Sequence, residues 1–303
     1  MGDLGALEQI AKGQLLKNES LSHYTSWRAG GPAEFLYIPK DLEDLSRVLP
    51  YVPVEMPVTW LGLGSNTLVR DGGIGGFVII TQGALMDLAN IDATHIRSGA
   101  GVSAGQLARY SARARLAGLE FMAGIPGTVG GALAMNAGCF NGETWQYVSA
   151  VETINRAGEI KIRLPSDFEI GYRHVIGQPD EWFVAGHFAL QAGDKEKSLN
   201  DIRNLLEKRN LTQPTGTANC GSVFRNPPGN HAGRLIESCG LKGKTIGQAS
   251  VSHKHANFII NEGQGTATHI EKLILEVAEI VLERTGICLK TEVCIMGKAF
   301  SGE

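Results

Sequence analysis

Two glycine-rich stretches decide the fold: residues 61–69 read LGLGSNTLV, and residues 124–138 read GIPGTVGGALAMNAG. The first follows the apolar run PVTWL, so its glycines let backbone N–H groups approach an anion while Ser65, Asn66 and Thr67 add side-chain donors. The second places five glycines and a proline ahead of a helix-like segment, which suits a second phosphate or the edge of a flat ring system. Either stretch alone is more often a plain tight turn, but two in one half of the chain favour a bound dinucleotide.

Two further glycine stretches are weaker candidates for a phosphate cradle. GKT at 243–245 resembles the end of a P-loop, but its opening glycine would stand at Ser238. GAGVSA at 99–104 fits G-x-G-x-x-A with Glu120 about twenty residues on, although the preceding ATHIRS is too polar for the buried first strand of a parallel sheet. We reject the P-loop interpretation of GKT and regard GAGVSA as a weak match.

The composition is that of a globular protein with a large core. Of 303 residues, 43% are hydrophobic and 19% are charged, and the length suggests roughly two or three domains. The net charge of −3 argues against a nucleic-acid partner. The start MGDLGALEQIAKGQ shows no signal peptide, and no run approaches the ~20 apolar residues of a membrane span. We expect a cytoplasmic protein without a membrane partner, and the sequence leaves its oligomeric state open.

The cysteines are odd in number and contain no C-x-x-C pair, as in a protein with reduced thiols; they stand at 139, 220, 239, 288 and 294. A zinc site with His253 and His255 is the alternative, but the spacing matches no ligand template, so we predict no metal. The two histidines are expected on one side of a strand, as structural residues.

Apolar periodicity predicts strands and helices in alternation along the chain. The expected strands are 33–39, 57–64, 75–81, 95–99, 148–155, 159–164, 182–190 and 287–297. The expected helices are 41–50 with Asp41 as N-cap, one after the N-cap Ser103, 198–211 with Ile202, Leu205, Leu206 and Leu211 near one stripe, and 269–286 with Gly286 as C-cap. This mixture predicts an α+β fold with a terminal domain of its own, whose boundary lies near residue 209.

Eight motifs in register carry a resemblance to a known family. They are TSWRAGGPA (25–33), LGLGSNTLV (61–69), GIPGTVGGALAMNAG (124–138), GYR (171–173), GSVFRNP (221–227), AGRLIESCGLKG (232–243), HANFIIN (255–261) and LKTEV (289–293). Together they resemble the UDP-N-acetylenolpyruvoylglucosamine reductases of peptidoglycan synthesis over nearly the whole chain. No long insertion follows GYR, as in the shorter of the family's two types.

The resemblance implies a two-lobed FAD-binding region of the vanillyl-alcohol-oxidase-like (PCMH) type and a C-terminal α+β substrate domain. We expect residues 1–80 to form the first lobe, with the tail 297–303 returning to it. Residues 81–208 are then the second lobe, and 209–296 the substrate-binding domain.

The resemblance also implies a reaction. NADPH reduces bound FAD, and the flavin N5 hydride adds to C3 of the enolpyruvyl group of UDP-N-acetylglucosamine enolpyruvate, which becomes UDP-N-acetylmuramate. Negative charge develops at C2 and its carboxylate, so the site needs a cation or acid beside the enolate and a proton donor at C2. The expected partners are the small UDP-sugar and NADPH.

Family position assigns three catalytic residues: Ser222 as the proton donor, Arg173 as the enolate-stabilising cation and Glu292 as an acid that assists the developing enol. From the residues alone, each has an ordinary alternative, namely a turn or capping serine, a surface ion pair and an exposed strand carboxylate. A triad nucleophile at Ser222 is disfavoured, because Phe224 stands where the motif G-x-S-x-G needs its second glycine. Glu292 is expected on the strand 287–297, facing away from its alternating apolar set.

The same resemblance implies ligand contacts in the glycine stretches and in the C-terminal part. FAD contacts are expected at Gly62, Gly64, Ser65, Asn66, Thr67, Leu68, Gly124, Ile125, Pro126, Gly127, Thr128, Gly130 and Gly131, and substrate contacts at Arg225, Arg234 and Asn257. Residues 209–255 hold six basic residues against one acid, Glu237, a net charge of +5 that suits a diphosphate-bearing, carboxylated substrate. A solvated basic face explains the same count equally well.

Cys220 departs from the family pattern, in which alanine commonly precedes GSVF. It either packs as a small hydrophobic residue or makes the site sensitive to thiol reagents. Two other functions stay open on the residues: a flavin oxidase of the same fold acting on another alcohol or sugar, and a non-catalytic nucleotide-binding module. The glycine stretches and the basic stretch would suffice for the latter.

Overall fold

The computed structural model describes residues 4–300, and the chain divides into two compact units. The first unit contains the described residues up to Lys17, Phe35–Leu63 and Gly76–Lys208. The second contains Asn18–Glu34, Gly64–Gly75 and the chain from Arg209 onward. Residues 1–3 of the predicted first lobe and 301–303 of the predicted tail lie outside the described residues, and the division at 80 and 208 stays a prediction.

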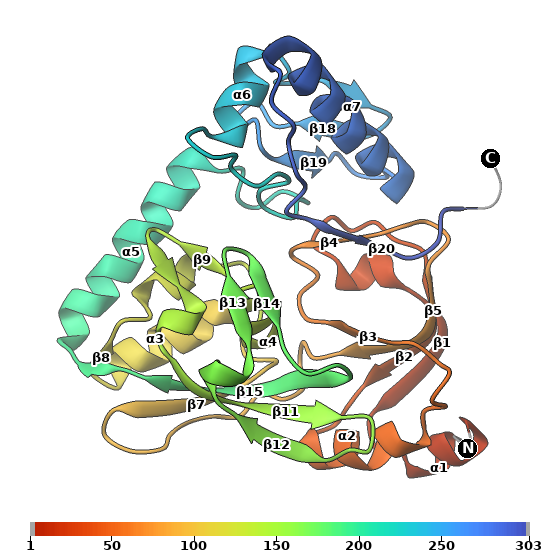
Figure 1. Ribbon diagram of the computed structural model, residues 1–303, viewed down its shortest axis with the longest axis vertical. Helices are drawn as coiled ribbons and strands as arrows, with labels where there is room; N and C mark the ends of the chain where they lie inside the picture. Colours follow the sequence, from red (N-terminus) through yellow and green to blue (C-terminus); the bar gives the residue numbers. More distant parts are fainter. Residues whose placement is uncertain (1–3, 301–303) are drawn as a thin grey trace. The chain divides into compact units, whose positions relative to one another are not determined.

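An antiparallel sheet of five strands forms one part of the first unit, in the order β12-β11-β15-β7-β6. Its strands are β6 (Leu88–Asn90), β7 (His95–Gly99), β11 (Val148–Asn155), β12 (Ile160–Arg163) and β15 (Glu181–Ala189). Helices α3 (Ala104–Arg113) and α4 (Val129–Ala134) cover one face of this sheet (Figure 1). Leu107, Val151 and Phe188 are fully buried in the core between them.

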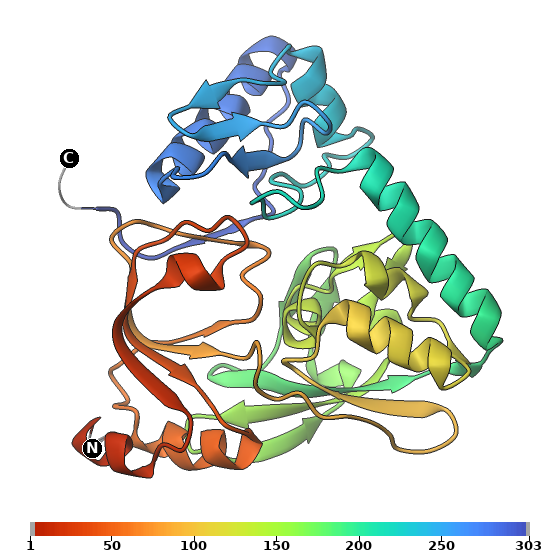
Figure 2. The same ribbon diagram turned by 180° about the vertical axis from the view of Figure 1, so that it is seen from behind.

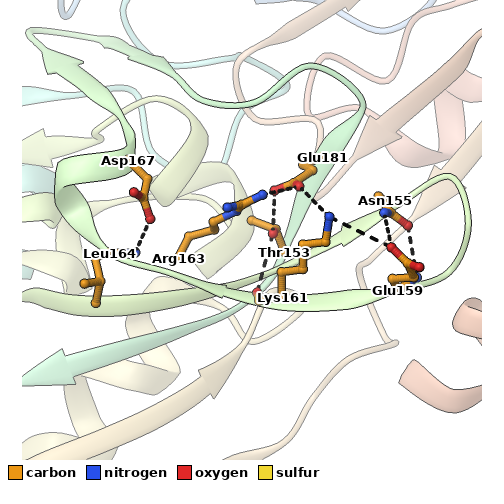
Figure 3. Close-up of polar contacts among 8 residues, drawn as sticks. All are labelled: Thr153, Asn155, Glu159, Lys161, Arg163, Leu164, Asp167 and Glu181. Atoms are coloured by element: carbon orange, nitrogen blue, oxygen red, sulfur yellow. Dashed lines mark hydrogen bonds and ion pairs between the residues drawn. The ribbon is translucent and has the colours of Figure 1, made fainter.

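The edge strand of this sheet is held by an ion-pair cluster. Glu181 on β15 accepts from Arg163 on β12 at 2.6 and 3.0 Å, and from Thr153 on β11 at 2.9 Å (Figure 3). The hydrogen bonds from Arg163 hold the pKa of the Glu181 carboxyl below its usual range. One carboxylate therefore connects three neighbouring strands.

A second sheet has the order β1-β2-β5-β3 and carries the first helices of the chain. Its strands are β1 (Gln14–Ser20), β2 (Pro32–Ile38), β3 (Val58–Leu61) and β5 (Ile74–Ile80), and the helices are α1 (Leu4–Ile10) and α2 (Leu42–Val48). Asp41 caps α2 by accepting from the backbone N–H of Asp44, as predicted. Tyr37, Leu45 and Phe77 are fully buried in the accompanying core.

Besides these two sheets, the chain up to Thr212 contains short strand pairs, 3-10 turns and the long helix α5 (Lys195–Thr212). The short strand pairs are β8 (Leu116–Ala117) with β16 (Gln191–Ala192), β9 (Gly138–Cys139) with β10 (Gly142–Glu143), and β13 (Glu169–Gly171) with β14 (His174–Ile176). Single 3-10 turns cover Leu21–Tyr24, Leu49–Tyr51, Glu120–Gly124, Thr144–Gln146 and Pro165–Asp167.

The second unit packs two helices on a small antiparallel sheet. Figure 2 shows helices α6 (Ala232–Ser238) and α7 (Ala267–Thr285), in blue, on one side of β17 (Thr245–Ile246), β18 (Ala249–Val251) and β19 (Ile259–Asn261). The predicted apolar stripe of α7 is buried as expected, at Ile270, Leu273, Ile274, Val277 and Val281. Gly286 ends α7 with φ +71°, which confirms the predicted C-cap.

Three local predictions are wrong. Only Cys294–Met296 of the predicted strand 287–297 forms a strand, β20, which pairs in parallel with β4 (Thr67–Val69). The preceding segment is irregular because its backbone bonds to a turn, so the alternation of apolar residues there is not strand alternation. Residues 253–257 form a turn and not a strand, and Leu211, in the last turn of α5, is 78% exposed. Within residues 4–300, no helix combines the length and apolarity that crossing a membrane requires.

Candidate functional site

The two predicted glycine stretches meet in the first unit. A Cβ on Gly62 would lie 2.4 Å from Thr128 Oγ1. The backbone at residue 62 is therefore so close to Thr128 that only glycine fits there. Thr128 caps α4 by accepting from the N–H of Gly131 at 3.3 Å. The start of the first stretch, at Gly62, is therefore in direct contact with the second stretch at Thr128.

The stretch GAGVSA at 99–104 supports the second glycine stretch. Gly130 N donates to Ala100 O at 2.9 Å and Val129 N to Val102 O at 2.8 Å. A Cβ on Gly130 would lie 2.9 Å from that of Ala100, which requires glycine at residue 130. Because β7 before this stretch pairs antiparallel with both neighbours, it is not the first strand of a parallel nucleotide-binding sheet.

Arg173 is connected to the end of the second glycine stretch. It occupies the turn between β13 and β14 with φ +55°. Its guanidinium donates to the backbone oxygens of Asn136, at 3.3 Å, and Gly138, at 2.6 Å. The structure thus brings the predicted catalytic arginine to the predicted FAD stretch.

The polar end of the first glycine stretch lies in the second unit, beside Glu292. Gly64 takes φ +59°, and a Cβ there would lie 2.2 Å from Tyr24 O. Asn66 Nδ2 donates to Glu292 O at 3.1 Å, and Cys294 N donates to Asn66 O at 3.0 Å. Residues 292–294 are therefore held against Asn66.

Ser222 lies in a turn that is bonded to the same segment. Gly221 has φ +73° and donates from its N–H to Asn219 Oδ1 at 2.9 Å. Glu292 N donates to Val223 O at 2.8 Å, which places the Glu292 backbone beside the residue that follows Ser222. Ser222 and Glu292 are both half-buried, so each keeps a face toward solvent.

Asn257 forms three hydrogen bonds with the backbone that follows Ser222. Its side chain accepts from Phe224 N at 3.0 Å and donates to Phe224 O at 2.8 Å, and its backbone oxygen accepts from Val223 N at 2.9 Å. Asn257 is buried. The substrate contact of Asn257 stays a prediction, whereas its hydrogen bonds to the backbone of residues 223–224 are observed.

Cys220 packs in the core next to this turn. Its Sγ lies 3.3 Å from Gly64 O and 3.5 Å from Thr67 O. Burial raises the pKa of the thiol to about 12. Of the two interpretations of Cys220, the structure favours the small hydrophobic residue.

The basic stretch at 209–255 is partly neutralised. Lys242 pairs with Glu237 at 2.6 Å, and Lys244 pairs with Glu276 of α7, an acid outside the counted range. The sequence count of +5 therefore overstates the local positive charge. Arg234 is exposed on α6 and donates to Asn230 Oδ1 at 2.9 Å, while the backbone N–H of Arg225 donates to Lys290 O at 2.9 Å.

His255 behaves as a structural histidine. Burial lowers the pKa of His255, and its Nδ1 lies 3.2 Å from the N–H of Asn257. Nδ1 therefore accepts, which fits a neutral ring. Across the part of the chain that the structure describes, no group of three or more His, Cys, Asp or Glu side chains is arranged to hold a metal ion.

Sequence reasoning missed two polar residues that hold these segments. Asn136 is buried at the end of the second glycine stretch, and Asp71 follows the first one and accepts from the first backbone N–H groups of α7. The only sequence signal for Asn136 was its place inside the quoted stretch 124–138. Asp71 carried none, because its partners are almost 200 positions away in the chain.

The donors in the two glycine stretches suit FAD chemically. Backbone N–H groups, the side chains of Ser65 and Asn66 and the hydroxyl of Thr128 are neutral donors of the kind that surround a diphosphate. The close backbone approaches at Gly62 and Gly130 leave no room for other side chains there. The residues present therefore fit the cofactor that the motifs imply.

Known families and proteins resemble this chain over both units. A family of FAD binding domains matches residues 33–162, and the UDP-N-acetylenolpyruvoylglucosamine reductase C-terminal domain family matches residues 213–296. A UDP-N-acetylenolpyruvoylglucosamine reductase of Legionella pneumophila (strain Corby) is 57% identical over 290 residues, covering 95% of this chain and 94% of the relative. One of Alkalilimnicola ehrlichii is 53% identical over 298 residues, covering 98% of this chain and 100% of the relative.

A solved structure shows the same fold. The crystal structure of UDP-N-acetylenolpyruvylglucosamine reductase (MurB) from Thermus caldophilus superposes with a TM-score of 0.80 at 33% identity, covering 94% of this chain and 99% of that one. The predicted fold class, α+β with an FAD-binding region and a C-terminal domain, is confirmed by these matches.

Proposed function

This chain belongs to the UDP-N-acetylenolpyruvoylglucosamine reductase family, and from that premise we propose that it reduces UDP-N-acetylglucosamine enolpyruvate to UDP-N-acetylmuramate with NADPH, in the cytoplasm. It is an FAD-dependent oxidoreductase of peptidoglycan synthesis. The observation that carries the proposal is the junction in the second unit, where the Asn66 side chain donates to Glu292 O and the Glu292 N–H donates to Val223 O in the turn of Ser222. A loop of the FAD stretch is thereby bonded to the segments that carry two proposed acids.

The glycine stretches are proposed to hold FAD, whose flavin ring supplies the hydride. Gly62, Gly64, Gly124, Gly127, Gly130 and Gly131 give the backbone its close approach, and Ser65, Asn66, Thr67, Leu68, Ile125, Pro126 and Thr128 provide the remaining contacts. Neutral donors at the diphosphate leave its charge to be balanced by solvent and the nearby backbone dipoles. The expected partners are small molecules: NADPH and the UDP-sugar, with Arg225, Arg234 and Asn257 on the sugar side.

Ser222 is proposed to protonate C2 of the enolate. A hydroxyl in a glycine turn is held at a defined place, and the half-buried position of Ser222 keeps its oxygen available to a ligand. Glu292, on the neighbouring segment, assists the enol. Arg173 stabilises the negative charge, and its planar, permanently charged guanidinium suits a carboxylate-derived enolate.

Visible spectroscopy under anaerobic conditions tests the proposal. The purified protein is expected to show flavin absorbance that bleaches with NADPH and returns when UDP-N-acetylglucosamine enolpyruvate is added. Ser222→Ala should bleach normally but recover about 100-fold to 10,000-fold more slowly, as expected for loss of a general acid. Ser111→Ala, which removes a buried hydroxyl of α3, serves as the matched control and should recover at the normal rate.

Two outcomes would contradict the proposal. Protein that stays colourless after FAD is added would leave only a nucleotide-binding module. Stoichiometric peroxide release in air from another alcohol or sugar, without NADPH, would identify a flavin oxidase of the same fold.

A further inference from the structure

Asn136 is a buried polar residue with all its side-chain contacts inside the first unit. Only 3% of it is exposed, and its backbone takes φ +40°. Nδ2 donates to Gly171 O at 3.1 Å and to Glu143 Oε2 at 3.1 Å, and Oδ1 accepts from Trp145 N at 3.1 Å. Its carboxamide therefore both donates and accepts, and it joins the segment 143–145 to Gly171.

One of these contacts connects Asn136 to the β13–β14 hairpin that carries Arg173. Gly171 stands two residues before Arg173, and the Asn136 side chain holds its carbonyl. The backbone oxygen of Asn136 accepts from Arg173 NH1 at 3.3 Å, and Gly138 O accepts from NH2 at 2.6 Å. A single residue thus contacts the hairpin backbone with its side chain and the guanidinium with its main chain.

The chemistry of the position requires asparagine or a close equivalent. A positive φ disfavours most side chains, and asparagine is among those that tolerate it. Aspartate could not donate to Gly171 O and would face the Glu143 carboxylate. Alanine would lose all three side-chain contacts and add backbone strain, whereas glycine would lose the contacts alone.

We infer that Asn136 is a positioning residue for Arg173: its side chain holds the hairpin backbone at Gly171, and its own carbonyl accepts from the guanidinium, so that the guanidinium has one orientation. The inference rests on the proposed function, which assigns Arg173 to the enolate. Since the enolate forms only when the sugar is reduced, Asn136 should matter in that half-reaction and not in flavin reduction by NADPH.

The test measures the two half-reactions separately by anaerobic stopped flow on the FAD-loaded protein. Asn136→Gly and Asn136→Asp should bleach with NADPH at the normal rate and recover with UDP-N-acetylglucosamine enolpyruvate about 100-fold more slowly, the effect expected of a reacting group displaced by about 1 Å. Arg173→Ala should show the same selective loss. The double variant Asn136→Gly/Arg173→Ala should be no slower than Arg173→Ala alone, because residues that act as a unit are not additive.

Thr153→Val is the matched control, since it removes another buried polar contact of the first unit, the one to Glu181 (Figure 3), and no hydrogen bond of Thr153 involves Asn136 or the β13–β14 turn. It should recover at the normal rate. Normal recovery of both Asn136 variants, or additive losses in the double variant, would overturn the inference. Loss of FAD from both Asn136 variants would overturn it too, because a structural role would then suffice. Wild-type protein that does not recover with the sugar would instead overturn the proposed function, and the role of Arg173 with it.

Discussion

Single residues with positive φ shape the turns at or beside the proposed catalytic residues. Gly64 and Gly221 take positive φ, which glycine adopts without steric cost. Arg173 takes φ +55° with a full side chain, a conformation that costs on the order of 1 kcal/mol or more. Its hydrogen bonds to the carbonyls of Asn136 and Gly138 offset that cost.

Cys220→Ala is expected to retain the catalytic rate. Burial raises the pKa of the thiol well above its usual value, so the thiolate is scarce near neutral pH and Cys220 is a poor nucleophile and a poor target for alkylation. Losing the buried sulfur should cost about 1 kcal/mol of unfolding free energy. Turnover assays check the catalytic rate, and urea unfolding checks the loss of unfolding free energy. A loss of turnover as large as that of Ser222→Ala would refute the assignment of Ser222.

His255 is expected to make stability depend on pH. Its pKa is lower in the folded than in the unfolded protein, so the unfolded chain binds more protons below the unfolded value of about 6.5. The contribution is complete above that pH and is lost as the pH falls, with a slope below ~1.4 kcal/mol per pH unit.

Urea unfolding of His255→Gln at pH 5, 6 and 7 measures this contribution. The slope of stability against pH should be shallower than in the wild type. His23→Gln, at an exposed histidine, is the control and should keep the wild-type slope. An unchanged slope in His255→Gln would show that other groups cause the pH dependence.

At the level of elements, helix α7 is tied to the segment that follows the first glycine stretch. Asp71 accepts from Ala267 N at 2.9 Å and Thr268 N at 2.8 Å, which satisfies backbone donors in the first turn of α7. Arg70 forms a two-point ion pair with Glu271, at 2.8 and 2.9 Å. Because both residues follow Gly64–Thr67 closely, α7 helps to place that end of the glycine stretch.

Asp71→Ala should therefore affect both stability and FAD. Loss of the helix contacts should cost about 1–2 kcal/mol of unfolding free energy, and loosening of residues 64–67 should weaken FAD binding. Flavin fluorescence titration and urea unfolding measure the two effects. Asp41→Ala removes the comparable cap of α2 and should cost similar stability with normal FAD affinity. Equal FAD affinity in both variants would argue against a link between α7 and the glycine stretch.

At the scale of the whole molecule, the compact units are assembled from segments that are far apart in the chain. The second unit takes Asn18–Glu34 and Gly64–Gly75 from the N-terminal part and joins them to the chain from Arg209 onward. Trp27 shows this joining, since its indole N–H donates to Ile259 O at 2.8 Å and Asn261 Nδ2 donates to its carbonyl at 2.9 Å. The predicted FAD contacts at Ser65 and Asn66 lie in this second unit.

FAD should consequently stabilise the folded chain by mass action. At about 100 times its dissociation constant, a ligand of the folded state raises the unfolding free energy by about 2.7 kcal/mol. Thermal unfolding with and without FAD measures this. Riboflavin, which lacks the diphosphate, should stabilise less if the glycine stretches bind phosphate, and an equal shift with riboflavin would contradict that assignment.

The elements that periodicity predicted correctly have their signal in neighbouring positions of the chain. The apolar pattern of 148–155, the apolar stripe of α7 and the caps at Asp41, Ser103 and Gly286 can each be recognised within a short stretch of sequence. The prediction of a strand over 287–297 came from the same kind of local pattern and is wrong for most of its length. Leu289 and Val293 are apolar because they are buried in the core, and the backbone between them bonds to partners that are remote in the chain.

Family motifs, and not periodicity, singled out Ser222, Arg173 and Glu292, and the assignment of their roles remains a proposal. What no motif contained is how these residues are held. Asn66 and Glu292 are 226 positions apart, and Arg173 is 37 positions from the carbonyl of Asn136 that it contacts. Local patterns specify helices and caps, because their hydrogen bonds close within a few residues. They also indicate strands, because the alternation of apolar residues is local even though the strand's hydrogen-bonded partners are remote. The bonds that join the glycine stretch, the serine turn and Glu292 form only when packing brings remote segments together, so they become visible only in the folded chain.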